Sequence, residues 1–263
     1  MRIVRLAILV ACSLLSWPAP AQPQPPRIIA FGDSITWGAN ATNNSVRHYR
    51  PLLPLIWHTA GKQDTTYPGV LQCMARRPVL NYGVPGETTA EGLPRLIQLM
   101  GAIRPRLVLL MEGTNDMLAA SPLSSAIDSL TAEVRAVQHG GGTAILMTVP
   151  RTYYPLGSPS YAANARIMEL NTAIRRLAAQ LAVSLVDVEA AFPPTAQGVA
   201  LMRNHSGASD YLHPGNRGNA RIARAVMRAG VHAPPRDALQ AQLWRLTHRM
   251  IRLLQVQDYP LRR

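Results

Sequence analysis

The sequence predicts an α/β fold in which helices cover both faces of a central, mostly parallel sheet, forming a three-layer α/β/α sandwich. Three observations support this prediction. Short apolar runs of strand length alternate with longer segments that place apolar residues at steps of three and four. The longer segments carry Pro or Gly near their ends, as helices do. The 263 residues are 48% hydrophobic and 16% charged, which is typical of a packed globular protein and excludes long disordered tracts.

Five apolar runs are interpreted as strands that are buried on both faces. They span residues 27–31, 79–81, 106–111, 143–149 and 184–188. Four segments between them are interpreted as helices, over residues 67–76, 90–103, 122–138 and 160–181. Because strands and helices alternate, successive strands are expected to run parallel and to end at the same edge of the sheet.

Two long irregular segments interrupt this alternation, over residues 40–66 and 150–159. Both are rich in turn-forming residues and follow a strand or a motif turn, where α/β proteins place loops that face a ligand. The alternative is that each is a plain surface excursion, and the sequence leaves both interpretations open.

The N-terminal residues 1–21 have the three-part pattern of a secretory signal peptide. Two arginines precede an apolar run over residues 6–17, and the small residues of Ala19-Pro20-Ala21 follow as a cleavage site. The run is too short for a spanning helix, so we expect export to the periplasm or secretion after cleavage. An alternative is lipidation of Cys12, because residues 9–12 resemble a bacterial lipobox. After cleavage behind Ala21, Cys73 would be the remaining cysteine, which excludes an internal disulfide.

The positive charge is concentrated near the C-terminus. The chain has 27 basic and 14 acidic residues, a formal net charge of +13 and a pI near 10.9, whereas residues 22–215 are nearly balanced. Residues 230–263 are predicted to form a basic, amphipathic helical extension beyond a domain of residues 22–229. This extension could pack on the domain, form a dimer contact or attach to an anionic membrane. Nucleic-acid binding is not expected, since no basic stripe is interleaved with aromatic residues.

Four polar motifs follow the predicted strands or precede a helix. They occupy residues 32–35, 81–88, 112–116 and 210–214. Three of them leave successive parallel strands, and parallel strands end on one side of the sheet. A serine, a glycine amide, an asparagine amide and a histidine can therefore converge in one crevice.

These motifs resemble those of the SGNH hydrolases, also called GDSL esterases and lipases. They read Gly-Asp-Ser-Ile, Asn-x-Gly-x-x-Gly-x-Thr, Gly-x-Asn-Asp and Asp-x-x-His-Pro, and their order and spacing fit the family over about residues 27–229. One departure is Ile35, where the family often has Leu. The resemblance implies a flavodoxin-like sandwich of the SGNH-hydrolase type. The positions that match the four family residues are Ser34, Gly83, Asn115 and His213.

The side chains of these motifs suit the hydrolysis of an ester. A serine hydroxyl becomes a nucleophile when a base removes its proton, so Ser34 is the predicted nucleophile, His213 the base and Asp210 the group that orients His213. The resemblance implies an oxyanion hole made of the Ser34 and Gly83 amides and the Asn115 side chain. Supporting structural roles are expected for Asp33, Asn81 and Asp116.

The sequence therefore predicts an exported serine esterase that cleaves carboxylic esters through an acyl-enzyme. The resemblance allows acyl lipids, lysophospholipids, aryl esters, thioesters and acetylated sugars as substrates, and the sequence does not choose among them. The alternative is a non-catalytic protein of the same fold that binds polysaccharide or lipid. No metal site or cofactor is expected, because the histidines lack paired ligand spacing and no phosphate-binding or dinucleotide motif occurs.

Overall fold

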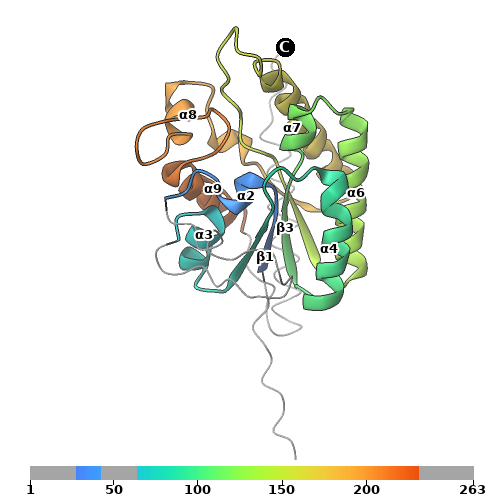
Figure 1. Ribbon diagram of the computed structural model, residues 1–263. Helices are drawn as coiled ribbons and strands as arrows, with labels where there is room; N and C mark the ends of the chain where they lie inside the picture. Colours follow the sequence, from blue (N-terminus) through green and yellow to red (C-terminus); the bar gives the residue numbers. More distant parts are fainter. Residues whose placement is uncertain (1–27, 43–63, 231–263) are drawn as a thin grey trace, which may run out of the picture.

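The computed structural model describes residues 28–42 and 64–230, and its centre is a five-stranded parallel sheet (Figure 1). The strand order is β2-β1-β3-β4-β5, and every neighbouring pair is parallel. The strands are β1 (Ile28–Gly32), β2 (Val79–Gly83), β3 (Leu107–Met111), β4 (Thr143–Met147) and β5 (Ser184–Val186). The predicted fold class is confirmed, and each predicted strand overlaps an observed one.

Helices form the two outer layers of the sandwich. One face of the sheet carries α3 (Tyr67–Ala75) and α9 (Asn216–Arg228), and the other carries α4 (Thr89–Ile103), α6 (Leu123–His139) and α7 (Ala163–Gln180) (Figure 1). Short helices lie within the connecting loops: α2 (Ser34–Trp37), α5 (Thr114–Leu118), the 3₁₀ helix η2 (Glu189–Ala191) and α8 (Ala196–Leu201). The four helices expected from apolar spacing are all present, with ends that differ by at most a few residues.

The core lies on both sides of the central strands. All five residues of β1 and all five of β3 are buried. Continuous apolar runs, without polar alternation, are what a parallel strand needs when helices cover both of its faces. The two runs therefore identify the centre of the sheet.

The direction of the connections reverses between β1 and β3. From β1 the chain passes through α3 to β2 on one side, and from β2 it returns through α4 to β3 on the other side of β1. The loops that leave β1 and β3 therefore diverge to opposite faces. In open α/β sheets this divergence forms a crevice at the carboxyl edge, where ligands bind.

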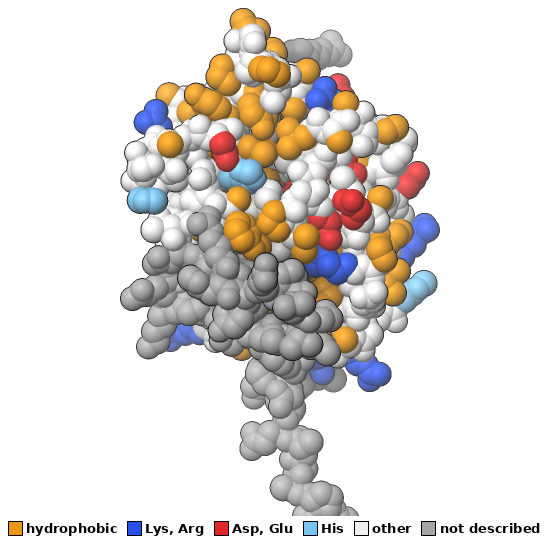
Figure 2. Space-filling view, in the orientation of Figure 1, with side chains coloured by type: hydrophobic (Ala, Val, Ile, Leu, Met, Phe, Trp, Pro, Cys, Tyr) orange, Lys and Arg blue, Asp and Glu red, His pale blue; other side chains and the backbone are white. Residues whose placement is uncertain are grey.

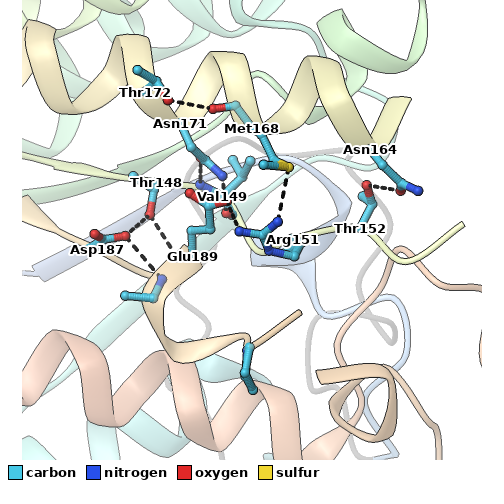
Figure 3. A network of polar contacts seen from close by, with 12 residues as sticks. Thr148, Val149, Arg151, Thr152, Asn164, Met168, Asn171, Thr172, Asp187 and Glu189 are labelled. Carbon is cyan, nitrogen blue, oxygen red and sulfur yellow. Dashed lines mark hydrogen bonds and ion pairs between the residues drawn. The ribbon is translucent and has the colours of Figure 1, made fainter. Parts of the chain in front are cut away.

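The segment after β4 is held in place by side chains of α7 (Figure 3). The strand predicted over residues 143–149 ends at Met147. At Val149, the fully buried Asn171 side chain takes the place of a neighbouring strand as the partner for the backbone hydrogen bonds. Its side-chain amide accepts from the Val149 N–H at 2.8 Å and donates to the Val149 carbonyl at 3.0 Å. Two turns earlier on α7, Asn164 donates to the Tyr154 carbonyl at 2.8 Å. The irregular segment thus has defined anchors on a rigid helix.

Several sequence-based expectations lie outside the described residues. These are the signal peptide over residues 1–21, the lipidation alternative at Cys12, most of the irregular segment 40–66, and the C-terminal helical extension from residue 231 onward. Among the helices of residues 28–42 and 64–230, none combines the length and the apolar character that crossing a membrane requires.

Replacement of Asn171 by Leu is expected to lower the free energy of unfolding by about 3 kcal/mol, because it leaves both buried backbone groups of Val149 without a partner. Urea unfolding followed by circular dichroism measures this change. The control is Thr172→Ala, next along the same helix, where the hydroxyl bond to Met168 is exposed. A loss in the Asn171 variant no larger than in the control would contradict the anchoring role.

Candidate active site

Ser34 is the first residue of α2 and follows the carboxyl end of β1 directly after Asp33. The Asp33 side chain caps α2 by accepting from the Ile35 N–H at 2.8 Å. Gly38, with a φ of 87°, ends the helix after a single turn. Ser34 is therefore fixed at the start of a short, capped helix, at the edge of the sheet where its position in the sequence predicts it to lie.

The Ser34 hydroxyl contacts the imidazole of His213, although 179 positions separate the two residues. The distance from Ser34 Oγ to His213 Nε2 is 2.9 Å, and His213 Nδ1 lies 2.6 Å from Asp210 Oδ2. Serine, imidazole and carboxylate thus form one continuous chain of hydrogen bonds. In the space-filling view, a histidine beside an acidic side chain lies between two groups of hydrophobic side chains on the face shown (Figure 2).

Asp210 remains ionised beside the histidine. Partial desolvation would raise the pKa of this carboxyl, but hydrogen bonds from the His213 ring and backbone outweigh it and hold the pKa below its ordinary value. The second carboxylate oxygen accepts from the backbone N–H groups of His213 at 2.8 Å and of Leu212 at 3.1 Å. These bonds fold the loop so that one carboxylate fixes both the backbone and the ring of His213.

Asn40 fixes the histidine loop from the other side and was not singled out by the sequence. Its side-chain amide donates to the carbonyls of His213 and Met202, each at 3.0 Å. Asn40 follows α2 closely in the chain, so it links the segment that carries the serine to the segment that carries the histidine. No local pattern could reveal this role, since its partners lie more than 160 positions away.

The helix after the histidine loop is tied down by a second amide. Asn219 of α9 is fully buried, and its Nδ2 donates to the carbonyls of Pro214 at 3.0 Å and Gly215 at 3.2 Å. Its Oδ1 accepts from the Tyr67 N–H at 3.1 Å, at the start of α3. Packing of α9 on α3 therefore determines where the His213 loop stands.

The loop after β2 is pinned to α2 through Asn81. Asn81 Nδ2 donates to the Thr36 carbonyl at 2.9 Å, which agrees with the structural role expected for Asn81. Its Oδ1 accepts from the Gly83 N–H at 3.0 Å. The assignment of the Gly83 amide to the oxyanion hole is therefore corrected, because this N–H already has a partner within its own loop. A Cβ at Gly83 would also meet the Trp37 and Asp33 backbone, so the glycine is needed for close packing.

One amide of this loop is left without a partner. Val84 N–H donates to the Gly32 carbonyl at 2.9 Å, and Glu87 N–H donates to the Val84 carbonyl at 3.3 Å. Pro85 has no N–H. Within residues 83–88, the Gly86 N–H alone has no hydrogen-bond acceptor among the described residues. Gly86 is exposed and has a φ of 83°, a left-handed conformation that suits glycine.

The loop after β3 brings Asn115 against the same turn. Asn115 Nδ2 donates to the Glu87 carbonyl at 2.8 Å, so one of its two amide hydrogens is held and the other is available. Asp116 accepts from the Thr89 N–H at 3.0 Å and from the Thr89 hydroxyl at 2.8 Å. These bonds tie α5 to the start of α4, which is a structural contact of the kind expected for Asp116.

Within residues 28–42 and 64–230, no group of three or more His, Cys, Asp or Glu side chains is arranged to hold a metal ion. The groups that converge at the carboxyl edge are a serine paired with a base, a carboxylate that orients the base, and amide donors. This set is suited to acyl transfer.

A sequence model of the GDSL-like lipase/acylhydrolase family matches residues 30–221, which include all four motifs. The chain belongs to this family. An arylesterase of Vibrio mimicus is 28% identical over 148 residues, which cover 56% of this chain and 64% of the arylesterase. The chain thus spans somewhat less than two thirds of that relative's length. The family description and the name of this relative both refer to hydrolases of ester bonds.

Solved structures of GDSL proteins share the fold. A lipase/acylhydrolase from Enterococcus faecalis superposes with a TM-score of 0.59 at 21% identity, covering 78% of this chain and 94% of that one. A carbohydrate acetylesterase family member from Sinorhizobium meliloti superposes with a TM-score of 0.58 at 18% identity, covering 78% and 97%. At these identities the similarity shows a common α/β/α architecture.

Asp33, the aspartate of the Gly-Asp-Ser motif, is fully buried. Burial raises the pKa of its carboxyl from 3.8 to about 6, although the hydrogen bond from the Ile35 N–H opposes the shift. Its Oδ2 has no hydrogen-bond partner in the described part of the chain. Because the folded state binds this proton more tightly than the unfolded state does, Asp33 makes the folded state less stable as the pH rises from about 3.8 to about 6.

Replacement of Asp33 by Asn is expected to remove this pH dependence while retaining an acceptor for the Ile35 N–H. Relative to the wild type, the Asn variant should gain about 2–3 kcal/mol of unfolding free energy between pH 4 and pH 7. Urea unfolding of both proteins at several pH values measures the difference. A stability difference that stays constant over this range would show that Asp33 titrates normally.

Proposed function

We propose that the protein is an exported serine esterase that hydrolyses carboxylic esters through an acyl-enzyme intermediate. The observation that carries this proposal is the hydrogen-bonded chain from Ser34 Oγ through His213 to Asp210, with distances of 2.9 and 2.6 Å. This geometry matches the arrangement of nucleophile, base and orienting carboxylate that acyl transfer requires. Membership of the acylhydrolase family supports it.

The base acts twice in the proposed reaction. His213 Nε2 removes the Ser34 proton as Oγ attacks the ester carbonyl, and the imidazolium then donates this proton to the departing alcohol. Water then attacks the acyl carbon while His213 takes its proton; the bond from this carbon to Ser34 Oγ breaks, the acid leaves, and the proton passes from His213 back to Oγ. Asp210 keeps Nδ1 protonated, so that Nε2 faces the serine as an acceptor, and its negative charge stabilises the imidazolium.

The oxyanion is proposed to form among the Ser34 amide, the Gly86 amide and the free hydrogen of Asn115. Ser34 N–H is the first amide of α2, and Gly86 N–H is the unpartnered donor of the turn that contacts Asn115 through Glu87. Donors that are held in place before the reaction stabilise the developing charge without reorganisation. Gly86 replaces Gly83 in this proposal, because the Gly83 amide is occupied by Asn81.

The non-catalytic alternative accounts poorly for the geometry. A protein that only binds polysaccharide or lipid has no need for an imidazole within hydrogen-bonding distance of a serine hydroxyl, nor for a carboxylate that fixes the imidazole tautomer. The ester-hydrolase proposal explains both contacts.

Apolar side chains near the site favour esters with an apolar group. The segment after β4 exposes Leu156 by 83% and Tyr161 by 45%, and Val84 in the turn before Gly86 is 38% exposed. The Tyr153 N–H donates to the Tyr211 carbonyl of the histidine loop at 3.0 Å, which brings this segment beside the site. Figure 2 shows hydrophobic side chains gathered on this end of the molecule. We therefore favour aryl or acyl-chain esters over acetylated sugars.

The proposed export depends on the N-terminal sequence alone. Two arginines, an apolar run and a small-residue cleavage site within residues 1–21 support cleavage behind Ala21 and action in the periplasm or outside the cell.

Replacement of Ser34 by Ala is expected to reduce hydrolysis of p-nitrophenyl butyrate by about 10⁴-fold or more, because the nucleophile is lost while the fold is kept. A fluorophosphonate probe should label the wild type and not the variant. The control is Ser125→Ala, an exposed serine on α6 that lies outside the four motifs. Full activity or labelling in the Ser34 variant would refute the proposed nucleophile.

Longer acyl chains are expected to raise kcat/KM relative to acetate, up to the length that the apolar side chains can cover. Replacement of Leu156 by Ser should reduce the advantage of p-nitrophenyl octanoate over the acetate by about tenfold, since each buried methylene contributes about 0.8 kcal/mol. Met74→Ser on α3, which is also exposed, is the matched control. A higher kcat/KM on acetylated xylan than on any p-nitrophenyl ester would favour the acetylated-sugar alternative.

A further inference from the structure

A compact group of charged side chains lies behind the turn that carries Gly86, outside the Ser34-His213-Asp210 chain. It combines Arg95 of α4, Glu87 of the turn, Glu112 directly after β3, and Glu133 of α6. Glu112 and Glu133 are completely buried, Glu87 is 8% exposed and the Arg95 side chain is 24% exposed. Three acids around one arginine in the interior require an explanation, because isolated charges are costly to bury.

Arg95 clamps both ends of the turn. Its Nη1 donates to the Tyr82 carbonyl at 3.0 Å, near the end of β2. Its Nε donates to Glu87 Oε1 at 2.7 Å, and its Nη2 forms an ion pair with Glu87 Oε2. The guanidinium lies 3.9 Å from the ring centroid of Phe31 in β1, so it rests on the sheet. A planar fork that bonds three acceptors at once restricts the turn to one conformation.

The clamped turn holds two of the three proposed oxyanion donors. Gly86 lies between Tyr82 and Glu87, the two residues to which Arg95 bonds. The Glu87 carbonyl accepts from Asn115 Nδ2 at 2.8 Å. A shift of the turn would therefore move the Gly86 amide and release the Asn115 side chain together. Arg95 touches neither substrate nor the reacting atoms, so any effect on catalysis has to pass through this turn.

Beneath Arg95, the Glu112 and Glu133 carboxyls are both completely buried, and each influences the pKa of the other. No N–H or hydroxyl group of the described residues donates to either carboxyl. Two carboxylates repel, whereas a carboxylic acid and a carboxylate bond to each other, so the pair has to hold at least one proton. Gly92 of α4 makes room for this arrangement, because a Cβ there would lie 2.7 Å from Glu112 Oε2.

We propose that Arg95 is a positioning residue that aligns the Gly86 and Asn115 donors, and that the clamp holds only while the Glu112–Glu133 pair stays protonated. Glu112 Oε1 is 3.9 Å from Arg95 Nη2, the same nitrogen that pairs with Glu87. An ionised pair would compete with Glu87 for this nitrogen and loosen the turn. The inference rests on the proposed oxyanion hole and assigns residues that the four motifs do not include.

The charges that face the buried pair all belong to this region. They are Arg95 on α4, Glu87 in the turn and Asp116 on α5. Burial, first of all, raises the pKa of Glu133 to about 8 and that of Glu112 well above its ordinary value; Arg95 opposes both shifts, and the nearby acids Glu87 and Asp116 favour the protonated form. The clamp is therefore expected to weaken in the alkaline range, where the pair loses a proton.

The first test replaces Arg95 by Met or Lys and measures hydrolysis of p-nitrophenyl butyrate at pH 7. We expect Arg95→Met to lower kcat by about 10- to 100-fold and to change KM less than about twofold, because misaligned donors affect the transition state most. The kcat of Arg95→Lys should lie between those of the wild type and the Met variant. The control is Arg135→Met on α6, an exposed arginine. If Arg95→Met does not fold, the Glu87→Gln/Arg95→Met double variant removes both charges together and provides the measurement.

A double-mutant cycle separates positioning from general destabilisation. Asn115→Ala removes one donor that Arg95 is proposed to align. The fold reduction in kcat caused by Arg95→Met should therefore be smaller in this background than in the wild type, by a factor of about three or more. Equal costs in both backgrounds would overturn the positioning role. Absence of esterase activity in the wild type would instead refute the proposed function. This result differs from equal costs in the cycle, so the two failures can be told apart.

The pH profile tests the buried pair. The wild type should lose kcat by about fivefold or more between pH 7 and pH 9.5, whereas the Glu112→Gln/Glu133→Gln variant should stay within about twofold, since the neutral amides cannot compete for Arg95. Spontaneous ester hydrolysis is subtracted, and circular dichroism verifies that both proteins are folded across the range. An equal loss of kcat between pH 7 and pH 9.5 in the two proteins would overturn the role of the pair.

Discussion

The parallel direction of all five strands is the constraint on which the site depends. Because every strand ends at the same edge, the segments after β1, β2 and β3 lie close together there. Their proximity follows from the sheet topology and needs no sequence signal that links the segments to one another. The reversal of connections between β1 and β3 makes the loops after these two strands diverge to opposite faces. Ser34 and Asn115 follow these two strands, and His213 reaches the same edge through the packing of α9 on α3.

Asparagine side chains, three of them buried, convert this approximate convergence into a defined geometry. Asn81 ties the β2 loop to α2, Asn40 ties α2 to the histidine loop, Asn219 ties that loop to α3, and Asn171 holds the segment after β4. Each amide bonds to backbone groups of another segment, so each is both a stabilising contact and a positional restraint. Neutral amides achieve this without the desolvation cost of a charge.

The acidic residues divide into two classes according to their surroundings. Asp210 is half-exposed and accepts hydrogen bonds from His213, so it stays ionised and can stabilise an imidazolium. Asp33, Glu112 and Glu133 are fully buried, and burial favours their protonated forms. The same chemical group therefore supplies a negative charge at the histidine and favours a neutral acid behind the Gly86 turn, where Arg95 bonds to Glu87 and lies 3.9 Å from Glu112.

The sequence by itself determined the fold class, the strand and helix segments and the serine, histidine and aspartate of the site, because apolar periodicity and short motifs are local properties. The sequence assigned Gly83 to the oxyanion hole, although Gly86 lies in the same motif. The Asn81 side chain, which also bonds to the Thr36 carbonyl 45 positions away, occupies the Gly83 amide and leaves the Gly86 amide free. Arg95 lies within an ordinary helical pattern, and its partners come from β1, β2 and the turn. Hydrogen-bond partners that are set by packing between distant segments leave no periodic or motif signal, so the tertiary structure alone decided them.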